Sequence, residues 1–187
     1  GATMRRGFKA EAERRAEAVR QELGLGKDAA LDARELAAAH GISVRSADTL
    51  VDIGRLEHLE AVQPGAFSAC TFDLPRGKVI VTNPLSSPQR TQSDIAHEVS
   101  HVLLQHEVRT VEKVGDFSFF SCDPDEEQEA NWLAGCLLLP RPLLIRHLRR
   151  GRSIEDIAEE FNVSVDMAAY RVRATGALRQ VSARKAP

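Results

Sequence analysis

The sequence has no long hydrophobic run and few cysteines, and each absence excludes a class of protein. No stretch approaches the ~18 continuous apolar residues of a membrane-spanning helix, and the charged N-terminal region lacks the apolar segment of a secretion signal. The three cysteines, Cys70, Cys122 and Cys136, are odd in number and far apart, which excludes a disulfide framework and a zinc site made of four cysteines. We therefore expect a reduced, cytoplasmic protein that does not contact a membrane.

Internal repeats and low-complexity segments are also missing, whereas the composition is that of an ordinary globular chain. The 187 residues are 43% hydrophobic and 28% charged, which is enough apolar material for a buried core. Residues 141–187 carry ten Lys or Arg against five Asp or Glu, although the whole chain has a net charge of −2. A basic tail favours a polyanion or an acidic protein as partner, and a solvated basic face is the simpler interpretation.

Hydrophobic periodicity and turn residues predict an α+β fold. We expect one domain over residues 4–140, with a small antiparallel sheet of about three strands, and a helix-turn-helix-like tail over 141–187 packed on it. The segment 117–122 is a loop or a short strand. The expected helices cover 8–23, 32–40, 88–105, 126–139, 141–149, 153–161 and 164–175, and the β-prone runs are 42–44, 67–72 and 79–81.

A His-Glu-x-x-His motif lies in the helix expected over 88–105. His97 and His101 are four residues apart, so they differ by ~40° around the helix and project from one face. Two imidazoles in this arrangement can bind one zinc ion, and Glu98, ~100° away, can act as general base on a water beside the metal. The alternative is two ordinary histidines on an amphipathic helix.

A catalytic zinc ion needs a third protein ligand. The metzincin pattern places that ligand six residues after the second histidine, at Glu107, and requires a glycine midway. Leu104 occupies the midway position, so nothing ends the helix there. The third ligand must therefore come from another segment.

The helix expected over 126–139 offers a carboxylate on a suitable face. Glu127 shares its face with Asn131 and with small and apolar residues, whereas Glu129 points to the opposite side. We predict Glu127 as the third ligand and Asn131 as the group that accepts a hydrogen bond from the distal N–H of a ligating histidine. The simpler interpretation is an acidic helix start favoured by the helix dipole, which explains Glu129 but not the apolar continuation of the Glu127 face.

These motifs together resemble the ImmA/IrrE family of bacterial metallo-endopeptidases. The resemblance covers about residues 8–175 and depends most on the pattern E-x-E-A-N-x-x-A-x-x-L-L-x-P over 127–140, which is more specific than His-Glu-x-x-His. It implies a gluzincin-like Zn2+ site and, as substrate, a helix-turn-helix transcriptional repressor that is cleaved in a stress, DNA-damage or mobile-element response.

The chain departs from the family pattern in two places. Ser100 stands where the family usually has glycine, and Gln105 replaces a histidine often found four residues after the motif, with His106 next to it. We expect His106 and Tyr170 to be the candidates for a side chain that contacts substrate or an oxyanion. Cys122 lies five residues before Glu127 and is either a group that approaches the metal or a small buried residue.

The tail carries the pattern of a helix-turn-helix. Ser153 and Ser164 are suited to begin its two helices, and a recognition helix would present Arg171 and Arg173 to a DNA groove. Packing on the core, or docking of a substrate protein, is the alternative role.

We therefore predict a zinc endopeptidase in which His97, His101 and Glu127 hold the metal and Glu98 transfers the proton. The rival hypothesis is a non-enzymatic regulator that binds DNA or protein and has a degenerate metal site.

Overall fold

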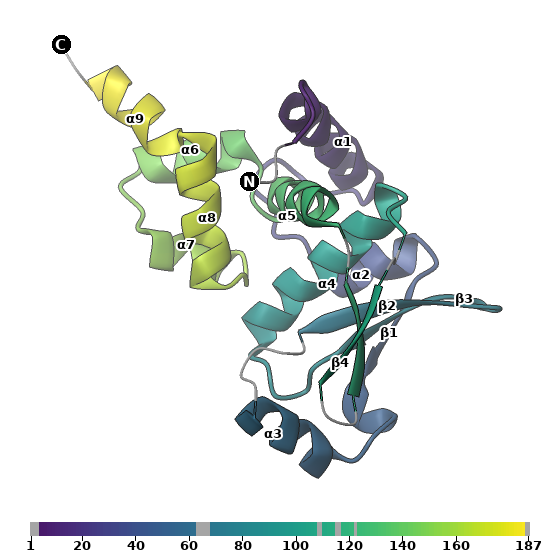
Figure 1. Ribbon diagram of the computed structural model, residues 1–187. Coiled ribbons are helices and arrows are strands. Elements are labelled where there is room, and N and C mark those ends of the chain that lie inside the picture. Colours follow the sequence, from purple (N-terminus) through teal and green to yellow (C-terminus); the bar gives the residue numbers. More distant parts are fainter. Residues whose placement is uncertain (1–3, 63–67, 108–109, 115–116, 122, 186–187) are drawn as a thin grey trace.

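The computed structural model describes residues 4–62, 68–107, 110–114, 117–121 and 123–185 (Figure 1). Cys122 lies outside the described residues. In chain order the elements are α1 (Phe8–Glu22), α2 (Ala33–Ala39), β1 (Ser43–Ser46), the 3-10 helix η1 (Ala47–Thr49), α3 (Ile53–Val62), β2 (Ala69–Leu74), β3 (Gly77–Thr82), α4 (Pro88–Leu103), β4 (Thr110–Val114), β5 (Phe117–Ser121), α5 (Pro124–Leu138), α6 (Arg141–Arg149), α7 (Ile154–Glu160), α8 (Val165–Thr175) and α9 (Ala177–Lys185).

Two long helices, α4 and α5, pack against each other at the centre of the molecule (Figure 1). Helix α4 begins at Ser87, whose Oγ accepts a hydrogen bond from the backbone N–H of Arg90, and has Pro88 at its first position. Helix α5 begins at Asp123 in the same way, with a hydrogen bond from the backbone N–H of Asp125. Helix α1 covers α5 and helix α2 covers α4, so the buried faces of four helices meet in one core.

The sheet lies on the other side of α4, and its topology corrects one prediction. The strand order is β1-β3-β2, with β2 antiparallel to β3 through the turn at 75–76 and β1 parallel to β3. The sheet is therefore mixed and not antiparallel. The reason is the long connection between β1 and β2, which contains η1 and α3 and lets the chain cross over before it forms the hairpin.

Three elements were not expected from the sequence. Residues 53–62 form α3, residues 177–185 form α9, and residues 110–114 form β4, which pairs with β5 (117–121) in an antiparallel hairpin. The sequence predicted either a loop or a short strand for residues 117–122, and the structure shows a strand over 117–121.

Helices α7 and α8 of the tail begin at the two serines that the sequence offered as caps. Ser153 makes a reciprocal capping box with Asp156, and Ser164 accepts a hydrogen bond from the backbone N–H of Met167. Arg171, however, is fully buried and does not face solvent. Its guanidinium donates to the Leu139 carbonyl oxygen and lies 2.8 Å from Glu13 Oε1, so it joins α8 to the end of α5 and to α1.

One continuous hydrophobic core runs from α1 and α2 through α4 and α5 into the tail helices. Trp132 and Cys136 belong to it, as expected. Within the described ranges, no helix is long and apolar enough to cross a membrane.

Candidate active site

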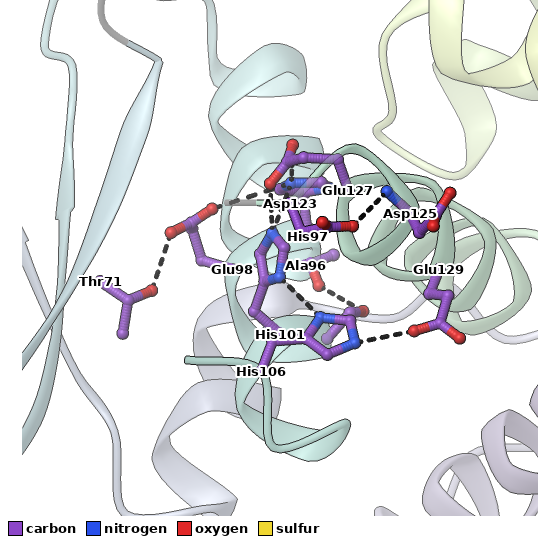
Figure 2. A network of polar contacts seen from close by, with 11 residues as sticks. Thr71, Ala96, His97, Glu98, His101, His106, Asp123, Asp125, Glu127 and Glu129 are labelled. Atoms are coloured by element: carbon purple, nitrogen blue, oxygen red, sulfur yellow. Dashed lines mark hydrogen bonds and ion pairs between the residues drawn. The ribbon is translucent and has the colours of Figure 1, made fainter. Parts of the chain in front are cut away.

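His97, His101 and Glu127 converge on one point between α4 and α5 (Figure 2). One ligand atom from each residue lies within 4.8 Å of the others. Nε2 of His101 is 2.8 Å from Glu127 Oε1, Nε2 of His97 is 3.2 Å from Glu127 Oε2, and the two Nε2 atoms are 3.1 Å apart. The spacing of four residues on α4 therefore places both rings on the face that meets α5.

Hydrogen bonds from the two histidines determine the charge of Glu127. Burial acts to raise the pKa of Glu127, but hydrogen bonds from His101 and His97 outweigh burial and hold that pKa well below its usual range. The carboxylate is thus ionised and points its oxygens at two imidazoles.

Glu98 lies beside this cluster without joining it. Its Oε2 is 3.9 Å from Nε2 of His97, and its Oε1 accepts a hydrogen bond of 2.8 Å from the Thr71 hydroxyl on β2 (Figure 2). Burial raises the pKa of Glu98, and the two histidines and Thr71 oppose that rise. A carboxylate with a raised pKa next to a metal site is suited to accept and return a proton.

Thr71 was not singled out from the sequence. It lies in a β-prone run 27 residues before Glu98, and no pattern in the sequence connects the two. Only the packing of β2 along α4 brings the hydroxyl to the carboxylate.

His106 lies against His101 and also lines the cleft beside Glu98. Its Nδ1 is 3.0 Å from Nδ1 of His101, and its Nε2 is 3.0 Å from Glu129 Oε1 (Figure 2). Both ring nitrogens are thus engaged, and neither is free to contact a substrate carbonyl in this arrangement.

Asn131 and Tyr170 lie together in a cavity whose lining does not include His97, His101 or Glu127. Both line this cavity of about 290 Å3 between α4, α5 and α8, with Asp94, whose pKa burial raises to about 6. Nδ1 of His97 is buried and has no hydrogen-bond partner among the described residues. The structure therefore does not form the hydrogen bond predicted between Asn131 and a ligating histidine.

A cleft of about 470 Å3 opens beside Glu98 and His101. Strand β2 forms one wall with Thr71, Phe72 and Asp73, and the C-terminal half of α4 forms the other. Strand β2 is also the edge strand of its three-stranded sheet.

The donor set fits a transition metal of the zinc type. Two imidazole nitrogens and one carboxylate oxygen are the ligands of gluzincin-like catalytic sites, and a three-ligand set leaves a coordination position open. The two Nε2 atoms and the carboxylate point at one place, where they would hold such a cation together.

The sequence family follows from a direct match. A model of the IrrE N-terminal-like domain matches residues 37–173, a range that contains all the converging ligands and Glu98. The chain belongs to this family. The resemblance seen in the motifs is thereby confirmed, and the IrrE N-terminal-like domain is a peptidase domain.

Two individual proteins are similar over most of the chain. The radiation response metalloprotease IrrE of Deinococcus radiodurans is 26% identical over 143 residues, which cover 73% of this chain and 43% of that protein. A structure described as a Mycobacterium tuberculosis transcriptional regulator has a TM-score of 0.52 and 18% identity, and the match covers 90% of this chain and 47% of the other. The chain thus spans less than half the length of each relative, and the second likeness concerns the fold alone.

Proposed function

We propose that this IrrE N-terminal-like domain is a zinc-dependent endopeptidase. The observation that carries the proposal is the convergence of His97, His101 and Glu127 with Glu98 next to them, at the side of a cleft. Zinc is the metal that this donor set favours, because two imidazole nitrogens and one carboxylate oxygen are a known ligand set of catalytic zinc sites that keep one coordination position open.

The residues divide the chemistry between them. A zinc ion held by the three ligands would supply Lewis acidity and a water of lowered pKa. Glu98 takes the proton of the attacking water and gives it to the leaving amine. Thr71 holds one oxygen of Glu98 through its hydroxyl, so that the other oxygen stays turned toward the ligands.

The cleft suits an extended peptide. An edge strand binds such a peptide by adding it to the sheet through main-chain hydrogen bonds, and β2 carries Thr71 toward Glu98 at the same edge. Tyr170 stays our candidate for a group that polarises the substrate carbonyl. Burial raises its pKa, so its hydroxyl keeps the proton that it would donate.

We propose a helix-turn-helix transcriptional repressor as substrate, cleaved to relieve repression under stress. The similarity to a protein named radiation response metalloprotease supports the response, and the family resemblance supports the substrate class. The rival function as a DNA-binding regulator has less support, because Arg171, one of its two proposed contacts, is buried.

The decisive experiment uses Glu98→Gln. The variant keeps the three ligands, so it should bind about one equivalent of zinc like the parent, whereas proteolysis should fall by several orders of magnitude because no carboxylate accepts the proton. Zinc is measured by metal analysis and cleavage by the products of a repressor or a peptide library. Activity within about tenfold of the parent would remove Glu98 from this role.

A further inference from the structure

The chain reverses direction where α4 ends, and this reversal places the His106 side chain against His101, one of the proposed zinc ligands. The backbone N–H of His106 donates to the His101 carbonyl oxygen and that of Gln105 donates to the Val102 carbonyl oxygen. This pair of bonds is a Schellman motif, in which the residue after the helix cap takes a left-handed conformation. That residue is Gln105, with φ of 58°, and not the usual glycine.

A non-glycine residue in this conformation costs about 1 kcal/mol, so other interactions must stabilise the turn. The turn folds His106 back over the last turn of the helix, where its side chain is only 7% exposed. The hydrogen bonds of the buried His106 ring can offset the conformational cost of the left-handed Gln105.

Those bonds form a chain from His101 to α5 (Figure 2). Nδ1 of His101 and Nδ1 of His106 are 3.0 Å apart, and Nε2 of His106 is 3.0 Å from Glu129 Oε1. Glu129 in turn lies 3.9 Å from the guanidinium of Arg5, just before α1. Glu129 is on the same helix as Glu127, but it contacts His106 and not the cluster of ligand atoms.

The positions of the protons follow from donor and acceptor rules. A histidine that ligates through Nε2 carries its one proton on Nδ1, so His101 is the donor in the contact with His106. His106 must then accept at Nδ1 and carry its own proton on Nε2, which points at the Glu129 carboxylate. Each bond thus requires the next one.

We propose that His106 and Glu129 are a positioning relay that fixes His101 in the Nδ1–H tautomer and presents its Nε2 lone pair to the metal. The relay rests on the proposed metal-dependent function. It supports one ligand only, because Nδ1 of His97 has no hydrogen-bond partner in the described part of the chain. It also gives Glu129 a role that its orientation on the helix did not suggest.

The first test measures zinc affinity by competition with a chelator. His106→Leu should weaken zinc binding about 10- to 100-fold, the range typical of partners behind a metal ligand. His106→Gln should restore most of the affinity, because its amide can accept from His101 and donate to Glu129. Glu129→Ala should weaken binding less than His106→Leu, and it should add nothing in the His106→Leu background, because Glu129 acts through His106.

Gln128→Ala is the matched control on the same helix, since Gln128 is exposed and makes no contact with the relay among the described residues. Its zinc affinity should equal that of the parent. Thermal unfolding of the metal-free variants separates a loss of affinity from a loss of fold.

The second test reads the tautomers directly. Long-range 1H–15N spectra of the zinc-loaded protein should show His106 as the Nε2–H tautomer, and Glu129→Ala should keep that tautomer because His101 still donates to Nδ1 of His106. His106 as the Nδ1–H tautomer would overturn the proposal, as would His106→Leu with the zinc affinity of the parent. A parent protein that binds no zinc would overturn the proposed function together with the relay, whereas the other two outcomes leave that function intact.

Discussion

At the scale of single residues, Glu127 and Glu129 show how the phase of a helix assigns different roles to equal side chains. They are two residues apart, so ~200° of rotation separates them on α5. Glu127 lies against His97 and His101, and Glu129 lies against His106. The carboxylates therefore differ in what they contact and not in their chemistry.

We predict that Glu127→Ala lowers zinc affinity by roughly 100-fold or more, because a three-ligand site loses its charged donor. The measurement is a zinc titration against a competing chelator, with Gln128→Ala as control. If Glu129→Ala empties the site while Glu127→Ala does not, the assignment of the ligand is wrong.

Thr71 gives a second prediction at this scale. Its hydroxyl lowers the pKa of Glu98 against the larger effect of burial, so Thr71→Val should raise that pKa further. Because Glu98 must be deprotonated to act as base, the acidic limb of the pH profile of kcat/KM should move to higher pH. Thr71→Ser keeps the hydroxyl and should keep the profile of the parent. An unchanged acidic limb in Thr71→Val would show that Thr71 does not tune Glu98.

At the scale of elements, Arg171 determines how α8 attaches to the rest of the chain. It donates to the carbonyl oxygen at the end of α5, pairs with Glu13 of α1 and stacks on Trp132, with its charged centre 5.3 Å from the ring. A Cβ on Gly135 would collide with the Arg171 stem, so α5 has a glycine where the arginine crosses it. Arg171, which the sequence suggested as a DNA contact, is instead buried and links α8 to α5 and α1.

Arg171→Leu should therefore lower the free energy of unfolding by about 3 kcal/mol, because it leaves Glu13 and a buried carbonyl without their partner. Arg173 is exposed on the same helix, and Arg173→Leu should change the free energy by less than about 0.5 kcal/mol. Urea unfolding at neutral pH measures both. Equal stability of the two variants would contradict the connecting role.

At the scale of the whole molecule, the proposed metal site joins α4 to α5, and both helices pack in the same continuous hydrophobic core. A ligand that binds the folded state alone stabilises it by mass action, by about 2.7 kcal/mol at 100 times its Kd. For a chain of this size we predict a rise of the unfolding temperature of roughly 5–10 °C with zinc at that level. Removal of zinc by a chelator should reverse the rise.

Glu127→Ala provides the control for this prediction, since it should unfold at the same temperature with and without zinc. Calorimetry or circular dichroism gives the measurement. A rise of equal size in this variant would mean that zinc stabilises the protein through other residues.

The sequence by itself determined the local structure and the chemical core of the site. Capping serines and a proline predicted that α4 starts at Pro88 and that α7 and α8 start after Ser153 and Ser164. These signals could be found in the sequence because they act within a few residues. The spacing of His97 and His101, and the helical face of Glu127, depend only on α-helix geometry. For that reason they could be predicted without any knowledge of packing.

Tertiary structure decided every feature that depends on segments far apart in the chain. Three features are of this kind: the parallel pairing of β1 with β3, the burial of Arg171, and the hydrogen bond from Thr71 to Glu98. In each case the residues that meet are far apart in the sequence, and no helical or strand periodicity relates them. His106 is the intermediate case: it is near His101 in sequence, but its position depends on a left-handed Gln105 and on Glu129 of another helix. Local propensity reaches only about one helical turn, and beyond it the packing of the core determines which groups meet.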